Sequence, residues 1–314
     1  MQMTDLTQYR PRLPWRWTHL GGLYNTMVRV PRWRRELSSY IHDEVRPLKD
    51  DVTVVIGVKN RVDYKLSNTL KSISLQVAPG VDIHTIVVDY DNEPSVADTI
   101  QRMCAEYSAQ YMRVSDRPTW CKPHCYNVAI KRAVTKYLMS CDADILLAQD
   151  FIEKSIEVLT RVPLSVVYSQ MLDLPESSGE VVEEWGRSGT AIDLQRLRLM
   201  TTPRSVGICN EGIFITYSCL FHFVRGYDEF YEEWGYEDSD VQKRFQFLGL
   251  EIISIKDSTF YLHQWHPKFQ SLDPDRTMEA HERNRRYFNK HSTVIRNPGG
   301  WGDFDYGRDD RHYS

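Results

Sequence analysis

Short apolar runs that alternate with helical stretches constrain the fold of this sequence more than any other feature. The run Val-Thr-Val-Val-Ile-Gly-Val at residues 52–58 has no polar alternation, which is typical of a strand buried on both faces of a parallel sheet. Strands are predicted at 52–58, 84–89, 111–114 and 137–145, and helices at 67–76, 95–108 and 127–134. Because strand and helix alternate, the sequence predicts an α/β fold with a mostly parallel sheet flanked by helices.

Polar side chains follow three of the predicted strands, at the point where each strand ends. The pairs are Asn60 and Arg61, Asp89 and Asp91, and Asp142 and Asp144. Ligands of parallel sheets bind beyond the carboxyl ends of the strands, so we expect these groups to meet in one crevice. On an extended strand Asp142 and Asp144 share a face, where both carboxylates can hold Mg2+ or Mn2+. The alternative is a solvated strand end whose acids cap the next helix.

The charge balance and the cysteine usage restrict the partners and the compartment. The net charge of −4 gives no support for nucleic-acid binding. Six cysteines scattered over 314 residues indicate a reducing compartment, which we take to be the cytoplasm. Cys121, His124 and Cys125 lack the second paired half of a structural zinc site, and we interpret them as loop residues. No apolar run approaches the roughly 20 residues that span a bilayer, so we expect a soluble chain.

Changes in composition divide the chain into three regions. Residues 1–48 form an arm that is rich in Arg, Trp, Tyr and Pro. This arm can pack across the main domain, or it can make peripheral contact with an anionic membrane surface. Residues 49–270 form the main domain, with halves at 49–150 and 151–270, and residues 271–314 form a basic helix and a glycine-rich tail.

Two motifs give the sequence a specific resemblance. Asp142-Ala143-Asp144 closes the fourth predicted strand, and Trp234-Gly235-Tyr236-Glu237-Asp238 lies in the second half of the main domain. Together with Asn127-Val128-Ala129 and the segments 54–61 and 86–92, they resemble the GT-A nucleotide-sugar glycosyltransferases of the family-2-like group. The two motifs are most similar to the galactosyltransferase and chondroitin-polymerase types. The resemblance implies a GT-A fold with a Rossmann-like sheet, a nucleotide-sugar half at 49–150 and a smaller acceptor half at 151–270.

The resemblance also implies a metal site and a nucleotide site. Asp142 and Asp144 would hold the divalent ion that bridges the UDP diphosphate, and His263 or His266 would complete its ligands. The residues implied for the nucleotide are Asn60, Arg61, Asp89, Asp91, Asn127 and Asp142, with Asp89 and Asp91 as alternatives for the contact with the base.

The second motif implies the residues that meet the acceptor. Asp238 would deprotonate the acceptor hydroxyl as general base, Glu237 would orient the acceptor, and Trp234 would stack on a sugar face. Gly235 and Tyr236 would complete the acceptor site. The simpler interpretation, that acids are favoured in the first turn of a helix by its dipole, explains the acids but not the preceding Trp-Gly.

These roles add up to a hexosyltransferase. The resemblance implies a metal-dependent, inverting enzyme that moves a sugar from a UDP-sugar, of galactose or N-acetylhexosamine type, to a hydroxyl of a glycan or glycoconjugate. The implied metal is Mn2+ or Mg2+. The alternatives are a retaining GT-A glycosyltransferase, a nucleotidyltransferase, for which the glycine-rich phosphate loop near the N-terminus is missing, and an inactive sugar-nucleotide-binding relative.

Overall fold

The fold is that of a computed structural model, which describes residues 30–45, 48–60, 63–187, 193–204, 212–267, 274–291 and 293–304. Most of the predicted arm, and with it the predicted membrane contact, lies outside these residues. Within the described ranges, no helix has both the length and the apolar character needed to cross a bilayer.

A seven-stranded mixed sheet lies at the centre, in the order β10-β6-β9-β4-β1-β2-β3. Its strands are β1 (Asp51–Val58), β2 (Asp82–Tyr90), β3 (Gln110–Val114), β4 (Tyr137–Cys141), β6 (Ser165–Tyr168), β9 (Phe214–Tyr217) and β10 (Glu251–Ser254). β9 is antiparallel to β4 and β6, and the other pairs are parallel. β1 lies between β2 and β4 and is buried on both faces, which explains its uninterrupted apolar sequence.

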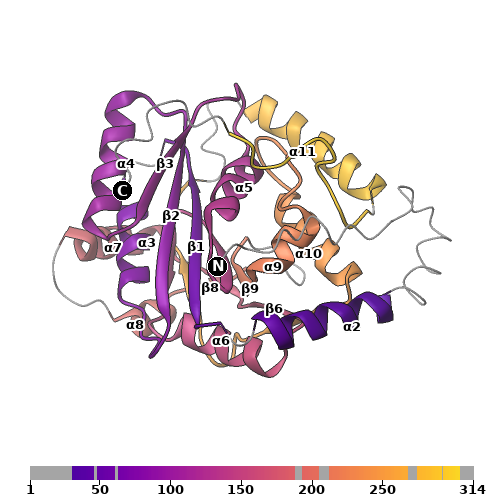
Figure 1. The fold of residues 1–314 in the computed structure, drawn as a ribbon. Helices are drawn as coiled ribbons and strands as arrows, with labels where there is room; N and C mark the ends of the chain where they lie inside the picture. The colour runs from indigo at the N-terminus through magenta and orange to yellow at the C-terminus, as the bar shows by residue number, and fades with distance from the viewer. Residues whose placement is uncertain are drawn as a thin grey trace.

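Helices cover both faces of this sheet (Figure 1). They are α2 (Val30–Tyr40), α3 (Tyr64–Ser74), α4 (Pro94–Glu106), α5 (Lys122–Arg132), α6 (Phe151–Arg161), α7 (Gly179–Arg187), α8 (Leu194–Arg198), α9 (Ser218–Val224), α10 (Glu237–Phe247) and α11 (Pro274–Lys290), with a π-turn at Ile41–Val45 and a 3-10 turn at Glu176–Ser178. α3 and α4 lie on one face of β1 to β3, whereas α5 lies on the other (Figure 1). The strand order therefore reverses between β1 and β4, where open α/β sheets bind their ligands. The predicted α/β fold is confirmed.

Local sequence signals explain where individual helices begin and end. Asp63 caps α3 by accepting a hydrogen bond from the backbone N–H of Lys65. Pro94 is the first residue of α4, a position where its missing N–H costs nothing. Gly249, with φ of +82°, follows the end of α10 in the left-handed region that glycine tolerates.

A second, four-stranded sheet joins segments from both halves of the chain. Its strands are, in spatial order, β5 (Ile145–Leu147), β11 (Tyr261–His263), β7 (Met171–Asp173) and β8 (Thr202–Pro203). The antiparallel pairing of β5 with β11 sets Ile145 opposite His263. The backbone N–H of Gln264 donates to the carbonyl of Asp144 at 2.9 Å. This register brings the end of the Asp-Ala-Asp motif beside the histidine segment.

The fourth predicted strand, 137–145, is divided between the two sheets. β4 ends at Cys141, the motif 142–144 forms the connection, and β5 starts at Ile145. The prediction that Asp142 and Asp144 share a face of one strand is therefore wrong. Apolar residues lie on both sides of the motif because β4 and β5 are both buried, and periodicity does not reveal that one strand stops before the motif.

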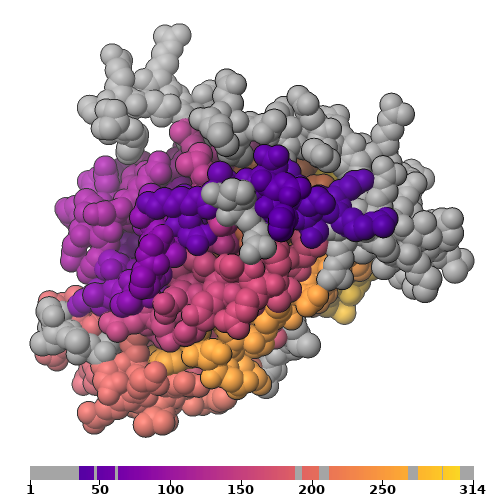
Figure 2. Space-filling view, turned by 60° about the horizontal axis from the view of Figure 1, so that its bottom comes forward, coloured from indigo at the N-terminus to yellow at the C-terminus, as the bar shows by residue number. Residues whose placement is uncertain are grey.

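The described part of the N-terminal region packs on the domain. α2 and the π-turn lie on the surface, where they form the indigo ridge in Figure 2. Leu37, Ile41 and Val45 point inward and belong to the main apolar core.

The described part of the C-terminal tail is tied to the second half of the domain by buried charges. Arg296 lies 3.1 Å from Asp228 and 3.1 Å from Asp240, and Asp240 also pairs with Arg244 at 2.7 Å. All four side chains are buried. Burial raises the pKa of Asp228, and the neighbouring Asp240 adds to the shift. The two arginines offset this repulsion, so the tail contributes to the stability of the domain.

Replacing Arg296 with methionine is expected to destabilise the protein by about 3 kcal/mol, because two buried carboxylates lose a partner. Urea unfolding followed by circular dichroism measures this change. The matched control is Arg285→Met, which removes an exposed pair with Glu282 and should leave the midpoint almost unchanged. Equal midpoints for the two variants would contradict the structural role of Arg296.

Candidate active site

Three of the predicted metal ligands lie together. Asp144, His263 and His266 each offer one ligand atom, and these atoms lie within 4.8 Å of one another. The Nε2 atoms of His263 and His266 are 3.7 and 3.3 Å from the two oxygens of Asp144. The sequence left the choice between the two histidines open, and the structure brings both to Asp144. Two imidazoles and one carboxylate are a suitable set for a transition-metal ion such as Mn2+.

Both histidines are oriented through their Nδ1 atoms. Nδ1 of His263 lies 2.9 Å from a carboxylate oxygen of Asp173, which is its register partner on β7, and Nδ1 of His266 lies 2.9 Å from the carbonyl of Pro267. Arg204 pairs with Asp173 in turn. Burial would raise the pKa of Asp173, but the hydrogen bonds from His263 and Arg204 outweigh it and lower the pKa to about 2. A metal-binding histidine usually has such a partner on its other nitrogen, so this cluster fits a metal site.

Asp173→Asn is expected to weaken Mn2+ binding by about 10- to 100-fold, because His263 loses the carboxylate that fixes its tautomer and ring orientation. Titration calorimetry with Mn2+ measures the affinity. The control is Glu176→Gln, which changes an exposed acid of the following turn and should keep the affinity of the parent protein. An unchanged affinity in Asp173→Asn would show that Asp173 does not support the site.

The first acid of the motif has a different partner. Asp142 lies 2.7 Å from the ammonium of Lys122, the first residue of α5, and is not part of the histidine cluster among the described residues. The same ammonium lies 3.1 Å from Asp238 and 3.9 Å from Glu237. Lys122 therefore connects the Asp-Ala-Asp motif with the Trp-Gly-Tyr-Glu-Asp motif.

Asp238 has the environment expected of a general base. It lies in the first turn of α10 and is buried with its neighbour Glu237. Burial raises the pKa of Asp238 to about 7, and the charges of Glu237 and Asp142 add to the shift while Lys122 opposes it. A carboxylate with a pKa near the working pH is well suited to accept a proton. A Cβ atom on Gly212 would lie 2.7 Å from Asp238, so only glycine leaves room at this point.

The turn before α10 is unusual in its backbone. Glu233, Gly235 and Tyr236 all have positive φ, at +62°, +100° and +74°. Such conformations cost energy in non-glycine residues and concentrate at functional sites. The ring of Trp234 stacks on His281 of α11 at 5.0 Å, and Trp234 is still 52% exposed. This arrangement leaves part of the Trp234 ring exposed at the start of α10, and its contact with an acceptor stays a prediction.

The residues predicted for the nucleotide differ in their surroundings. Asp89 is buried and accepts hydrogen bonds from Tyr111, at 2.6 Å, and from Asn92. Asp91 is exposed and lies 3.9 Å from Arg113. The backbone N–H of Asn60 donates to Asn92 at 2.7 Å, so the ends of β1 and β2 are linked. Arg61 lies outside the described residues.

Asn127 is held by protein groups on both sides of its amide. Its nitrogen donates to the carbonyl of Tyr227 and to Glu229, both at 2.9 Å, and its oxygen accepts from the N–H of Tyr227 at 2.7 Å. It is completely buried. We therefore do not carry Asn127 into the proposed nucleotide site.

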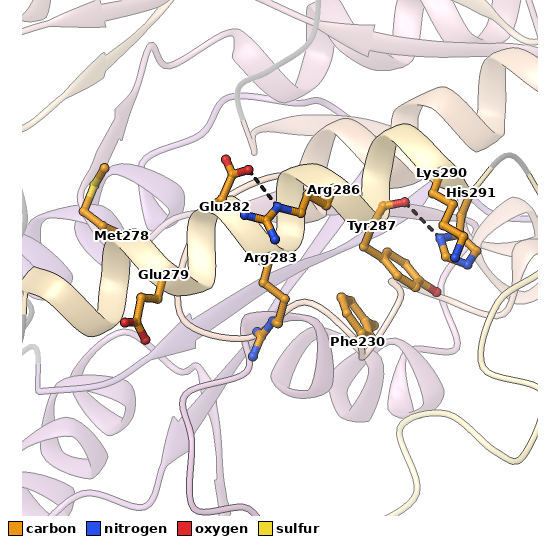
Figure 3. Close-up of a pocket in the computed structure, with 9 residues that line it drawn as sticks. All are labelled: Phe230, Met278, Glu279, Glu282, Arg283, Arg286, Tyr287, Lys290 and His291. Atoms are coloured by element: carbon orange, nitrogen blue, oxygen red, sulfur yellow. Dashed lines mark hydrogen bonds and ion pairs between the residues drawn. The ribbon is translucent and has the colours of Figure 1, made fainter.

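A shallow groove of about 700 Å3 runs along the exposed side of α11. Figure 3 shows the rings of Phe230 and Tyr287 facing one another there, with centroids 3.7 Å apart. The remaining lining residues are Met278, Glu279, Glu282, Arg283, Arg286, Lys290 and His291. None of the residues predicted for catalysis lines this groove. The candidate active site is therefore defined by its charged residues, away from the groove.

A comparison with protein-family models decides the family. The model described as "Glycosyltransferase like family 2" matches residues 53–290. The chain belongs to this family. The match contains both acidic motifs and the two histidines, and it confirms the predicted kinship with family-2-like glycosyltransferases. A search of curated proteins found no match.

Solved structures share the fold of this family-2-like chain. S. aureus TarS 1–349 has 14% identity and a TM-score of 0.50, over 68% of this chain and 60% of that one. Its complex with UDP-GlcNAc gives 13% identity and a TM-score of 0.51, over 73% and 64%. The mannosyltransferase PcManGT from Pyrobaculum calidifontis, in complex with GDP-Man and Mn2+, gives 15% and 0.49, over 80% and 68%. The chain thus matches less than two thirds of TarS 1–349, and the likeness to TarS concerns the fold alone.

Sequence reasoning missed three residues of this family-2-like site. Lys122 was not singled out, although it is the first residue of the helix that carries Asn127. Asp173 lies 2.9 Å from Nδ1 of His263, and Arg204 pairs with Asp173 in turn. Apart from their charge, no sequence signal marked them, since their role depends on the pairing of β7 with β11 and β8.

Proposed function

We propose that this protein is a metal-dependent, inverting glycosyltransferase that moves a sugar from a UDP-sugar to a hydroxyl of a glycan or glycoconjugate. The donor sugar is of the galactose or N-acetylhexosamine type. The observation that carries the proposal is the position of Asp238, a buried carboxylate. Lys122 contacts both Asp238 and Asp142, and Asp142 belongs to the same Asp-Ala-Asp motif as Asp144, which lies beside His263 and His266. The complex of TarS with UDP-GlcNAc supports a UDP-sugar donor.

The donor would lie across the carboxyl ends of β1, β2 and β4. We infer that Asp91 contacts the base, because both oxygens of Asp89 already accept hydrogen bonds within the protein. Asn60 and Arg61 would face the ribose and the phosphates. Asp144, His263 and His266 would hold Mn2+ in preference to Mg2+, since two of the three ligands are imidazoles. When bound, the ion would neutralise the diphosphate and stabilise the departing UDP.

The chemical step would be a single displacement at the anomeric carbon. Asp238 takes the proton of the acceptor hydroxyl, and the oxygen forms a bond to C1 as the bond from C1 to the diphosphate oxygen breaks. The electron pair of the broken bond leaves with UDP. Attack from the side opposite the diphosphate inverts the configuration at C1. Glu237 would orient the acceptor, and Trp234, Gly235 and Tyr236 would bind its sugar ring.

The cellular setting is also part of the proposal. The five cysteines in the described ranges are free thiols, which supports a reducing compartment such as the cytoplasm.

A panel of UDP-sugars, with and without Mn2+, tests the function. We expect one or two UDP-sugars to raise the melting temperature in the presence of Mn2+ and to be slowly hydrolysed to UDP. The same sugars should be transferred to glycan acceptors, and NMR of the product should show the opposite anomer to the donor. The absence of both a shift and UDP release across the panel would refute the proposal, and a retained anomer would refute inversion.

A further inference from the structure

Lys122 lies among three carboxylates of the two acidic motifs. Its ammonium lies 2.7 Å from Asp142, 3.1 Å from Asp238 and 3.9 Å from Glu237. The side chain is only 13% exposed, and a Cβ atom on Gly212 would lie 2.7 Å from its nitrogen. A buried cation among three carboxylates is held by their combined charge, and its removal leaves them to repel one another.

The two oxygens of Asp238 have different surroundings. Oδ2 accepts the hydrogen bond from Lys122, whereas Oδ1 is buried and has no hydrogen-bond partner in the described part of the chain. An unpartnered buried carboxylate oxygen is costly unless a ligand completes it. Lys122 thus fixes one oxygen and leaves the other for a donor group from outside the protein, as the hydroxyl of an acceptor would be.

We propose that Lys122 is the positioning residue of this site. It holds Asp238 by Oδ2, so that Oδ1 meets the acceptor hydroxyl, and it holds Asp142 apart from the cluster of Asp144, His263 and His266. The effect of Lys122 on catalysis rests on the proposed function. The ion pair of Lys122 with Asp238 does not require a bound substrate. The titratable groups that face Asp238 besides Lys122 are Glu237, Asp142, Tyr126 and Tyr227.

The kinetic test compares Lys122→Met with Lys122→Arg. Without the cation the ionised form of Asp238 is less favoured, so the acid limb of kcat/KM should move to higher pH by about one unit in Lys122→Met. Lys122→Arg keeps the positive charge, so its acid limb should lie close to the pH at which it lies in the parent protein. An acid limb that coincides with that of the parent protein, with only the KM for the UDP-sugar raised, would overturn the proposal and make Lys122 a donor contact.

A second test needs no activity and therefore separates this proposal from the proposed function. Asp238 has a raised pKa in the folded protein, so its ionisation opposes folding, and this cost grows as the pH rises from the ordinary value, near 3.8, to about 7, above which it stays constant. Lys122→Met should therefore lower the melting temperature more at pH 8 than at pH 5.5. Adding Asp238→Asn should remove most of that difference, because neither charge is then present. Additive effects of the two substitutions at pH 8 would refute the pairing.

Binding of Mn2+ tests the separation of Asp142 from the metal cluster. At pH 5.5 Asp238 is mostly protonated, so the loss of the Lys122 charge should destabilise the protein least. At this pH the Mn2+ affinity of Lys122→Met should lie within a few-fold of the affinity of the parent protein. The double variant Lys122→Met/Asp238→Asn provides the same comparison at pH 8. A loss of tenfold or more in both variants would show that Lys122 supports the metal cluster instead of standing apart from it.

Discussion

Asp144→Ala is expected to abolish Mn2+ binding and to lower sugar transfer by about 1,000-fold. Among the residues that the structure describes, Asp144 is the one carboxylate beside both histidines, and several kcal/mol of charge stabilisation at the leaving diphosphate would be lost with the ion. Calorimetry with Mn2+ and the rate of UDP release measure the two effects. The melting temperature should fall only modestly, since the cluster lies at the edge of the sheet and the apolar core is unchanged.

The matched control for Asp144→Ala is Asp142→Ala, one residue away in the same motif. Asp142 pairs with Lys122 and is absent from the cluster, so this variant should bind Mn2+ with nearly the affinity of the parent protein. Its transfer activity should still fall, because Lys122 loses a partner next to the proposed base. Equal losses of Mn2+ affinity in both variants would mean that the two acids share the ion, as the sequence motif alone predicts.

Asp238→Asn is expected to lower kcat by about 100- to 10,000-fold while the affinity for the UDP-sugar changes little. The amide has nearly the same shape but cannot accept the proton of the acceptor. In the parent protein kcat/KM should fall as the pH drops below about 7, because Asp238 must be ionised to act and its pKa is raised to about 7. The residual activity of Asp238→Asn should lack this limb.

Glu237→Gln is the control for Asp238→Asn. Glu237 is the adjacent acid in the same helical turn and is also buried. Its replacement should raise the KM for the acceptor and keep an acid limb, which should move below pH 7 because the charge of Glu237 helps to raise the pKa of Asp238. If Glu237→Gln removes the limb and Asp238→Asn keeps it, then the assignment of the base has to be exchanged.

The sequence was sufficient for the strands β1 to β4 of the central sheet, and it singled out the two acidic motifs. β1 could be predicted because it is buried between β2 and β4, so that both of its faces demand apolar residues. Asp238 was singled out because the helix dipole explains a helical turn of acids but not the preceding Trp-Gly, and its role as base stays a prediction. These are features that a short stretch of sequence records by itself.

The features that the sequence did not predict depend on contacts between segments that are far apart in the chain. The run from Tyr137 to Leu147 is mostly apolar apart from Ser140 and the two aspartates, and periodicity does not show that its halves belong to different sheets. Lys122 becomes a site residue only because α5 packs across β1 and sets it between Asp142 and Asp238. A lysine at the start of a helix gives no signal of such neighbours in the sequence.

The small second sheet has a consequence for how the protein is assembled. Asp144 and His263 are brought together by a pairing of only three residues on each strand, between segments far apart in the sequence. An ion bound by both would act as a removable cross-link that closes a long loop, and it would bind the folded chain alone. Metal supply would then set resistance to proteolysis as well as catalytic rate, and chelation should expose the junction between β5 and β11 before the central sheet opens.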